Sequence, residues 1–97
     1  MGISYKNAEF LVESRLRDAA GGSADACFEL GMAYSCGTGG VTVDLIQAHK
    51  WFNLAALGGN EAGQALRAEI AHEMSSREIA EAQRMARAWI ASSVGTA

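Results

Sequence analysis

A pattern of small residues that occurs twice constrains the fold of this chain more than any other feature. The segments around Gly22 and Gly58 share the pattern A-A-x-G-x-x-[DE]-A-x-x-x-L, and Leu30 aligns with Leu66 at the same offset of 36 residues. A period of about this length with two helical segments per unit is typical of an α-solenoid, where each helix pair buries its apolar face against the next. The sequence therefore predicts an all-α fold, an α-α superhelix.

Apolar residues at helical spacing predict about five helices, over residues 7–20, 24–36, 45–57, 61–73 and 76–91. Ser23, Asp44 and Asn60 each precede one of these ranges and are good N-cap residues. Ser75 with Glu78 gives a capping box before the last range. The fourth range has an expected inner stripe of four residues, namely Ala62, Ala65, Leu66 and Ile70.

Gly31 lies in the middle of the second predicted helix, where a glycine is about 1 kcal/mol less favourable than alanine. Such a glycine usually lets a neighbouring helix approach closely, so we expect a bulky aromatic side chain over it. Core positions are also predicted for the aromatic residues Tyr34, Trp51, Phe52 and Trp89.

Composition and charge exclude several classes of protein. The 97 residues are 49% hydrophobic and 20% charged and contain no proline, which is typical of one globular, helical domain. The formal net charge of −3, without a basic cluster, argues against nucleic acid and against an anionic membrane surface as partners. No apolar run approaches the roughly 18 residues that a membrane span needs.

Two cysteines, Cys27 and Cys36, fall on one predicted helix. Nine residues of helix separate them by about 13 Å, too far for a disulfide. They are therefore expected to be separate thiols, buried as small hydrophobic residues, in a reducing compartment such as the cytoplasm. The amino-terminal segment carries charges through its apolar part, so it lacks the pattern of a signal peptide.

No motif predicts a catalytic, cofactor or metal site. His49, expected at the surface, and His72 have no histidine or cysteine three or four residues away, whereas a zinc site needs about four ligands. The glycine-rich loop over residues 36–43 follows a helix and lacks the lysine of a phosphate-binding loop. Nucleophilic chemistry by Cys27 or Cys36 leaves a thiol-dependent enzyme or ligand-binding protein as an alternative.

The segment 24–58 resembles a Sel1-like repeat, a relative of the tetratricopeptide repeat. Two motifs carry the resemblance, Leu30-Gly31-x-x-Tyr34 and Trp51-Phe52-x-x-Ala55-Ala56-x-Gly58. Gly40 is an additional residue relative to the repeat, and the second copy has Arg67 where the glycine belongs. The segment 74–89 is similar to the capping helix of some bacterial arrays.

The resemblance implies a single Sel1-like repeat domain over residues 1–97. Within it we expect a half unit over residues 7–22 and one complete repeat over residues 24–58. A degenerate repeat with a capping helix follows over residues 60–91.

A protein of this family is expected to be a non-catalytic interaction module, a small adaptor or regulatory protein that binds a partner protein or peptide. Helical phase places seven candidate partner-binding residues at the surface, namely Phe10, Glu29, Met32, Ser35, Gln64, Arg67 and Ala68. A structural module that self-assembles into a homo-oligomer through its terminal helices is a further alternative.

Overall fold

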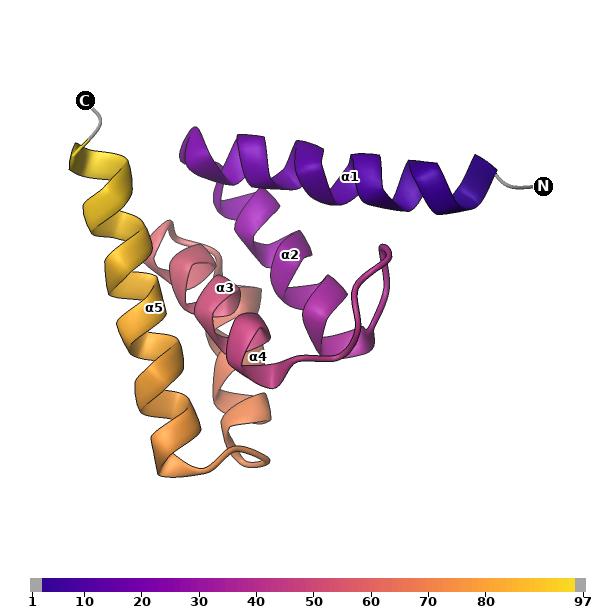
Figure 1. Ribbon diagram of the computed structural model, residues 1–97. Helices are drawn as coiled ribbons and strands as arrows, with labels where there is room; N and C mark the ends of the chain where they lie inside the picture. Colours follow the sequence, from indigo (N-terminus) through magenta and orange to yellow (C-terminus); the bar gives the residue numbers. More distant parts are fainter. Residues whose placement is uncertain (1–2, 96–97) are drawn as a thin grey trace.

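The computed structural model describes the backbone of residues 3–95 and the side chains of residues 11–92. This part of the chain folds into five α-helices without a strand (Figure 1): α1 (Ile3–Ala20), α2 (Ala24–Cys36), α3 (Leu45–Leu57), α4 (Glu61–Ala71) and α5 (Ser76–Gly95). The predicted all-α class and α-α superhelix are confirmed, and α2 and α3 have the predicted bounds. The other three helices differ at their ends, because α1 begins earlier, α4 ends at Ala71 and α5 continues to Gly95.

The predicted caps set where four helices begin. The side chains of Ser23, Asp44 and Asn60 accept a hydrogen bond from the backbone N–H three residues later, at 3.1, 3.1 and 2.8 Å. The Ser75 N–H donates to the Glu78 carboxylate at 2.8 Å, and the Glu78 N–H donates to the Ser75 hydroxyl at 3.1 Å. Each cap satisfies backbone donors that the first helical turn leaves without a partner.

The turn from α1 to α2 and the turn from α3 to α4 have the same geometry. Gly22 and Gly59 have φ angles of +98° and +95°, and each is followed by the N-cap residue, Ser23 or Asn60. Equivalent positions are therefore 37 residues apart (22 and 59), and the offset of 36 taken from the sequence pattern is wrong by one. The additional residue Gly40, in the loop between α2 and α3, is consistent with the longer period.

The corrected offset explains why the predicted inner stripe of α4 is partly wrong. Ala62 and Ala65 are exposed, whereas Gly63 and Ile70 are buried. Gly63 is the equivalent of Ala26, which is buried in α2. A slip of one residue turns a helix by about 100°, enough to move an inner position to the surface.

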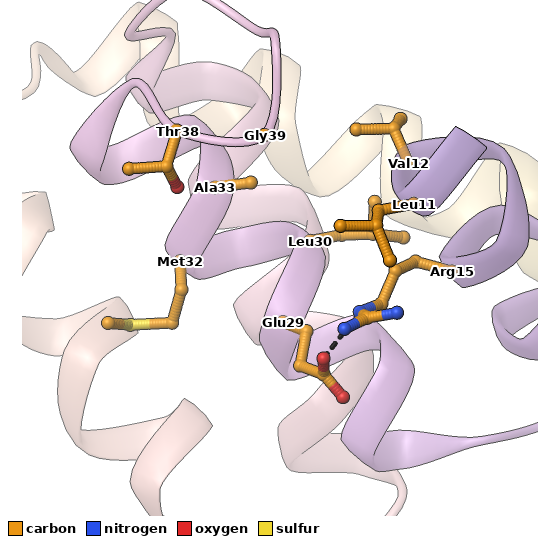
Figure 2. A pocket seen from close by; sticks show the side chains of 9 residues that line it. All are labelled: Leu11, Val12, Arg15, Glu29, Leu30, Met32, Ala33, Thr38 and Gly39. Carbon is orange, nitrogen blue, oxygen red and sulfur yellow. Dashed lines mark ion pairs between the residues drawn. The ribbon is translucent and has the colours of Figure 1, made fainter. Parts of the chain in front are cut away.

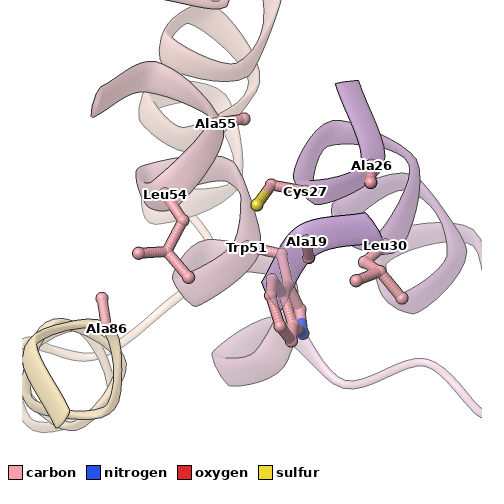
Figure 3. Packing of buried hydrophobic residues seen from close by; sticks show 8 residues of the cluster. All are labelled: Ala19, Ala26, Cys27, Leu30, Trp51, Leu54, Ala55 and Ala86. Carbon is pink, nitrogen blue, oxygen red and sulfur yellow. The ribbon is translucent and has the colours of Figure 1, made fainter. Parts of the chain in front are cut away.

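The third helix is the centre of the molecule, because α2, α4 and α5 all pack against it, whereas α1 packs chiefly on α2 (Figure 1). Trp51 of α3 meets Trp89 of α5 edge to face, with ring centroids 4.9 Å apart. The larger buried cluster gathers residues of α1, α2, α3 and α5 (Figure 3): Ala19, Ala26, Cys27, Leu30, Trp51, Leu54, Ala55 and Ala86.

A second cluster, here called the α3–α4 cluster, lies at the contact between these two helices. Its buried members are Ala48, Phe52 and Ile70, and Phe28 and Tyr34 of α2 are among the half-buried side chains packed against it. The Phe28 and Phe52 ring centroids are 5.8 Å apart. The α2 helix therefore supplies two aromatic side chains to the junction of the following helix pair.

The expectation of an aromatic side chain over Gly31 is confirmed, and that residue is Phe52. A Cβ atom built on Gly31 would lie 3.0 Å from Cγ of Phe52 and closer still to the edge of the ring. Phe52 is fully buried, so its ring has no free space into which it can move.

We predict that Gly31→Ala lowers the free energy of unfolding by about 1–3 kcal/mol, the usual range for overpacking a core. The loss occurs although alanine is intrinsically about 1 kcal/mol better than glycine in a helix. Urea unfolding of the variant measures the change. The same substitution in a Phe52→Leu background should cause a smaller loss, because the smaller side chain leaves room for the Cβ. An undiminished free energy in Gly31→Ala would contradict the packing role of Gly31.

Candidate functional site

An apolar groove separates α1 from α2 and is here called the α1–α2 groove (Figure 2). Its cavity volume is about 260 Å³, and three segments line it: Leu11, Val12 and Arg15 of α1, Glu29, Leu30, Met32 and Ala33 of α2, and Thr38 and Gly39 of the following loop. A second hollow shares Val12 and Gly39 with this groove and extends it along Glu13, Gly40 and Val41. The two together form one elongated depression.

Two large apolar side chains of the α1–α2 groove are exposed, Leu11 at 47% and Met32 at 37%, while Leu30 is buried at 1%. Arg15 of α1 forms an ion pair with Glu29 of α2 (Figure 2). Both partners are partly exposed, so the pair contributes little to stability. The groove therefore offers apolar contact area with one charge of each sign beside it.

The structure brings only some of the predicted partner-binding residues together. Glu29 and Met32 line the α1–α2 groove, and the Ser35 hydroxyl donates to the Met32 carbonyl oxygen at 3.2 Å. Gln64 and Ala68 are exposed on α4 and do not line it.

Of the two remaining predicted residues, only Arg67 has a described side chain, and it does not line the groove. Arg67 donates a hydrogen bond to the Asn53 side chain of α3, which holds its guanidinium against the neighbouring helix. Phe10 lies outside the described side chains. A role in partner binding remains a prediction for all seven residues.

Sequence reasoning missed the α1 side of this groove. Leu11, Val12 and Arg15 fall within the first predicted helix, over residues 7–20, and the sequence pattern assigns none of them a partner-binding role. An offset of 37 residues would have pointed to them, because it aligns Arg15 with Phe52, a core aromatic residue. A charged residue at the equivalent of a core position indicates that the two helix junctions are filled differently.

A separate apolar hollow lies between the terminal helices and the ends of α2 and α3, and is here called the α1–α5 hollow. Its volume is about 270 Å³, and its lining is Ala19, Ala20, Gly22, Ala24, Cys27, Leu54, Leu57, Gly58, Trp89 and Ile90. Leu57 is 67% exposed and Ile90 is 39% exposed at this hollow.

The two cysteines are free thiols, as expected, but only Cys27 is buried, whereas Cys36 is exposed. Burial raises the pKa of the Cys27 thiol, and the nearby Lys50 ammonium offsets part of the rise. That ammonium lies 4.2 Å from the ring centroid of Trp51 and 5.3 Å from that of Trp89. A raised pKa leaves less thiolate at neutral pH, which is the opposite of what a nucleophilic cysteine needs.

We predict that iodoacetamide modifies Cys36 rapidly in the folded protein and Cys27 only after unfolding, because the thiolate must be accessible to react. Mass spectrometry of the digested protein gives both rates, and Cys36→Ser isolates the reaction of Cys27. Equal rates at the two sites without denaturant would contradict the protection of Cys27 and would favour the thiol-dependent alternative.

His49 is 3% exposed, so the expectation of a surface histidine is wrong. It lies on α3, which other helices cover on several sides, and its Nδ1 atom has no hydrogen-bond partner among the described residues. Burial lowers the pKa of the His49 imidazole, and the positive charge of Arg67 lowers it further. The sequence pattern showed no partner for His49 and could not show that several helices pack on α3.

We predict that the protein becomes less stable as the pH falls below the ordinary histidine pKa of about 6.5. The folded-state pKa of His49 is below the unfolded value, so the unfolded chain takes up the proton first. This contribution to stability is complete above the unfolded pKa and is lost progressively as the pH falls towards the folded-state pKa. Urea unfolding at about pH 7.5 and at about pH 5.5, on either side of the unfolded pKa, measures the loss.

The matched variants for this measurement are His49→Gln and His72→Gln. His72 is exposed, so its replacement should leave the pH dependence in place, whereas His49→Gln should reduce it. An equal loss of stability in the His49→Gln variant would show that other groups cause the dependence.

No group of three or more His, Cys, Asp or Glu residues that could hold a metal ion occurs in the described part of the chain. Among the described helices, none combines the length and apolar character required to cross a membrane.

Helix pairs that recur with the same turn geometry define the class of this protein, a helical repeat of the superhelical kind. A family model described as the Sel1 repeat matches residues 24–60. The resemblance found in the sequence is thereby confirmed for this segment, which carries a Sel1 repeat. Sel1 repeats are in general protein-interaction modules without enzymatic activity. No curated protein and no solved structure matches the chain.

Proposed function

We propose that this chain is a non-catalytic module that binds a peptide segment of a partner protein in the α1–α2 groove. The observation that carries the proposal is the exposure of Leu11 and Met32 on opposite helices of one apolar groove. Exposed apolar side chains around a depression are a common feature of interaction sites. The two helices fix the positions of the lining residues, so a ligand meets a preformed surface.

The two alternatives to a peptide-binding module, a thiol-dependent protein and a self-assembling module, have less support. The raised pKa of Cys27 disfavours this residue as the nucleophile of a thiol-dependent enzyme. Self-assembly through the terminal helices finds some support in the α1–α5 hollow, where Leu57 and Ile90 are exposed. An adaptor or regulatory role, a bacterial origin and a cytoplasmic location, suggested by the resemblance and the free thiols, are parts of the proposal. The division into a half unit, a complete repeat and a capped degenerate repeat is also a proposal.

We predict that peptides selected from a random library against the protein lose affinity for the Leu11→Glu variant, because the new carboxylate would have to be buried under the ligand. A loss of at least about tenfold in affinity, or about 1.4 kcal/mol, is expected. Fluorescence anisotropy with labelled peptides gives the dissociation constants. Leu57→Glu is the matched control, since it places the same charge on an exposed leucine of the other hollow.

The selection distinguishes binding in the α1–α2 groove from binding in the α1–α5 hollow. Peptides that keep their affinity for Leu11→Glu and lose it for Leu57→Glu would move the binding site to the α1–α5 hollow. A selection that gives no specific peptide would contradict a peptide-binding function.

A further inference from the structure

The equivalence of the two helix pairs indicates what the α1–α2 groove lacks. Four of its lining residues correspond, at the offset of 37 residues, to four members of the α3–α4 cluster. The pairs are Leu11 with Ala48, Arg15 with Phe52, Glu29 with Leu66, and Ala33 with Ile70. The groove is therefore the counterpart of a cluster that is closed in the second helix pair.

The two junctions differ in what fills their centres. In the second pair, the ring of Phe52 and the side chain of Ile70 are buried in the cluster. In the first pair, Arg15 replaces the ring and forms an ion pair with Glu29, and Ala33 takes the place of the larger isoleucine. These replacements leave apolar volume unfilled and open to solvent.

The remaining volume of the α3–α4 cluster is filled by the helix that precedes it. Phe28 and Tyr34 of α2, six residues apart, pack on this cluster from the side, and Gly31 between them lies against the ring of Phe52. Within the described residues α1 is the first helix, so no described helix takes the corresponding position at the α1–α2 groove.

We propose that the α1–α2 groove receives an amphipathic helix of another protein that presents aromatic side chains at positions i and i+6, as α2 does towards the α3–α4 cluster. The proposal rests on the proposed function and names the ligand of that same site. The docked helix would extend the superhelix by one element, so the contact would continue the packing already present between α2 and the following helix pair.

The charges along the depression favour basic residues at the borders of this helix. Glu13 and Glu29 line it with a single guanidinium, that of Arg15. The lining is thus net negative, and a lysine or arginine beside the aromatic residues would complement it.

A second copy of this chain is a poorer source of the helix. The only aromatic residues six positions apart in the sequence are Phe28 and Tyr34. Both are already half-buried in the core of their own molecule, and α2 would have to leave it to dock elsewhere. Between a second copy and another protein, the required helix is therefore assigned to the other protein.

The probe for the test is a labelled peptide that copies residues 23–37. Asp25→Lys and Glu29→Lys give it basic borders, and Cys27→Ser with Cys36→Ser prevents oxidation. An isolated helix of this length is marginal in water, so the peptide should gain helicity on binding. Fluorescence anisotropy measures its affinity for the whole protein, and circular dichroism measures the helicity gained.

Two matched pairs decide the outcome. The peptide with Phe28→Ala and Tyr34→Ala should bind at least about tenfold more weakly than the probe, because it lacks both aromatic side chains. The protein variant Ala33→Ile fills the groove with the side chain found at Ile70 and should likewise weaken binding at least about tenfold. Ala65→Ile, on the exposed side of α4, is the control and should bind the probe normally.

Equal affinity for the two peptides, or for the Ala33→Ile and Ala65→Ile proteins, would overturn the inference. If Ala33→Ile does not fold, Leu11→Glu replaces it, because Leu11 is exposed and its replacement disturbs no core packing. Light scattering with the unliganded protein gives a further outcome. If the protein forms a dimer that the probe dissociates and that Ala33→Ile abolishes, the occupant of the groove is a second copy, and the inference is overturned.

The proposed function can survive the failure of this inference. Library peptides that depend on Leu11, combined with a probe that does not bind, would leave a peptide-binding groove whose ligand is not a helix of the α2 type. The absence of both kinds of binding would contradict the two proposals together.

Discussion

The contact between Phe52 and Gly31 holds the α2–α3 pair together, and the rest of the structure depends on that pair. The glycine has no side chain, so the phenylalanine ring lies directly on the α2 backbone. The buried ring then serves as the centre of a cluster to which α4 adds Ile70. With α5 packed on its remaining side, α3 becomes the element around which the other helices are arranged.

Much of this arrangement could be predicted from the sequence, because local rules decide it. Ser23, Asp44 and Asn60 are of the residue types that favour the N-cap position of a helix. A mid-helix glycine next to aromatic positions predicts a close crossing of two helices. The phase of α4 could not be predicted with the same certainty. Small residues on adjacent positions fit two alignments almost equally well, and only the turn geometry chooses between them.

The burial of His49 and the presence of the α1–α2 groove depend on tertiary packing, which no local pattern contains. His49 would be a surface residue if only one helix packed on α3, and it is a core residue because several do. The groove exists because Arg15 and Ala33 are smaller or more polar than their equivalents in the second pair. That difference becomes visible only when the two pairs are aligned at the correct offset.

The unequal attachment of the helices has a consequence for ligand binding. The described part of α1 packs chiefly on α2, while α3 is held on three sides, so α1 should have the lowest free energy of local opening and the fastest amide hydrogen exchange. Opening of α1 removes one wall of the groove. A bound helix would therefore hold α1 in place, and the measured affinity would include the free energy of docking α1 onto α2. Substitutions that strengthen this docking, even far from the groove, should tighten binding without touching the ligand.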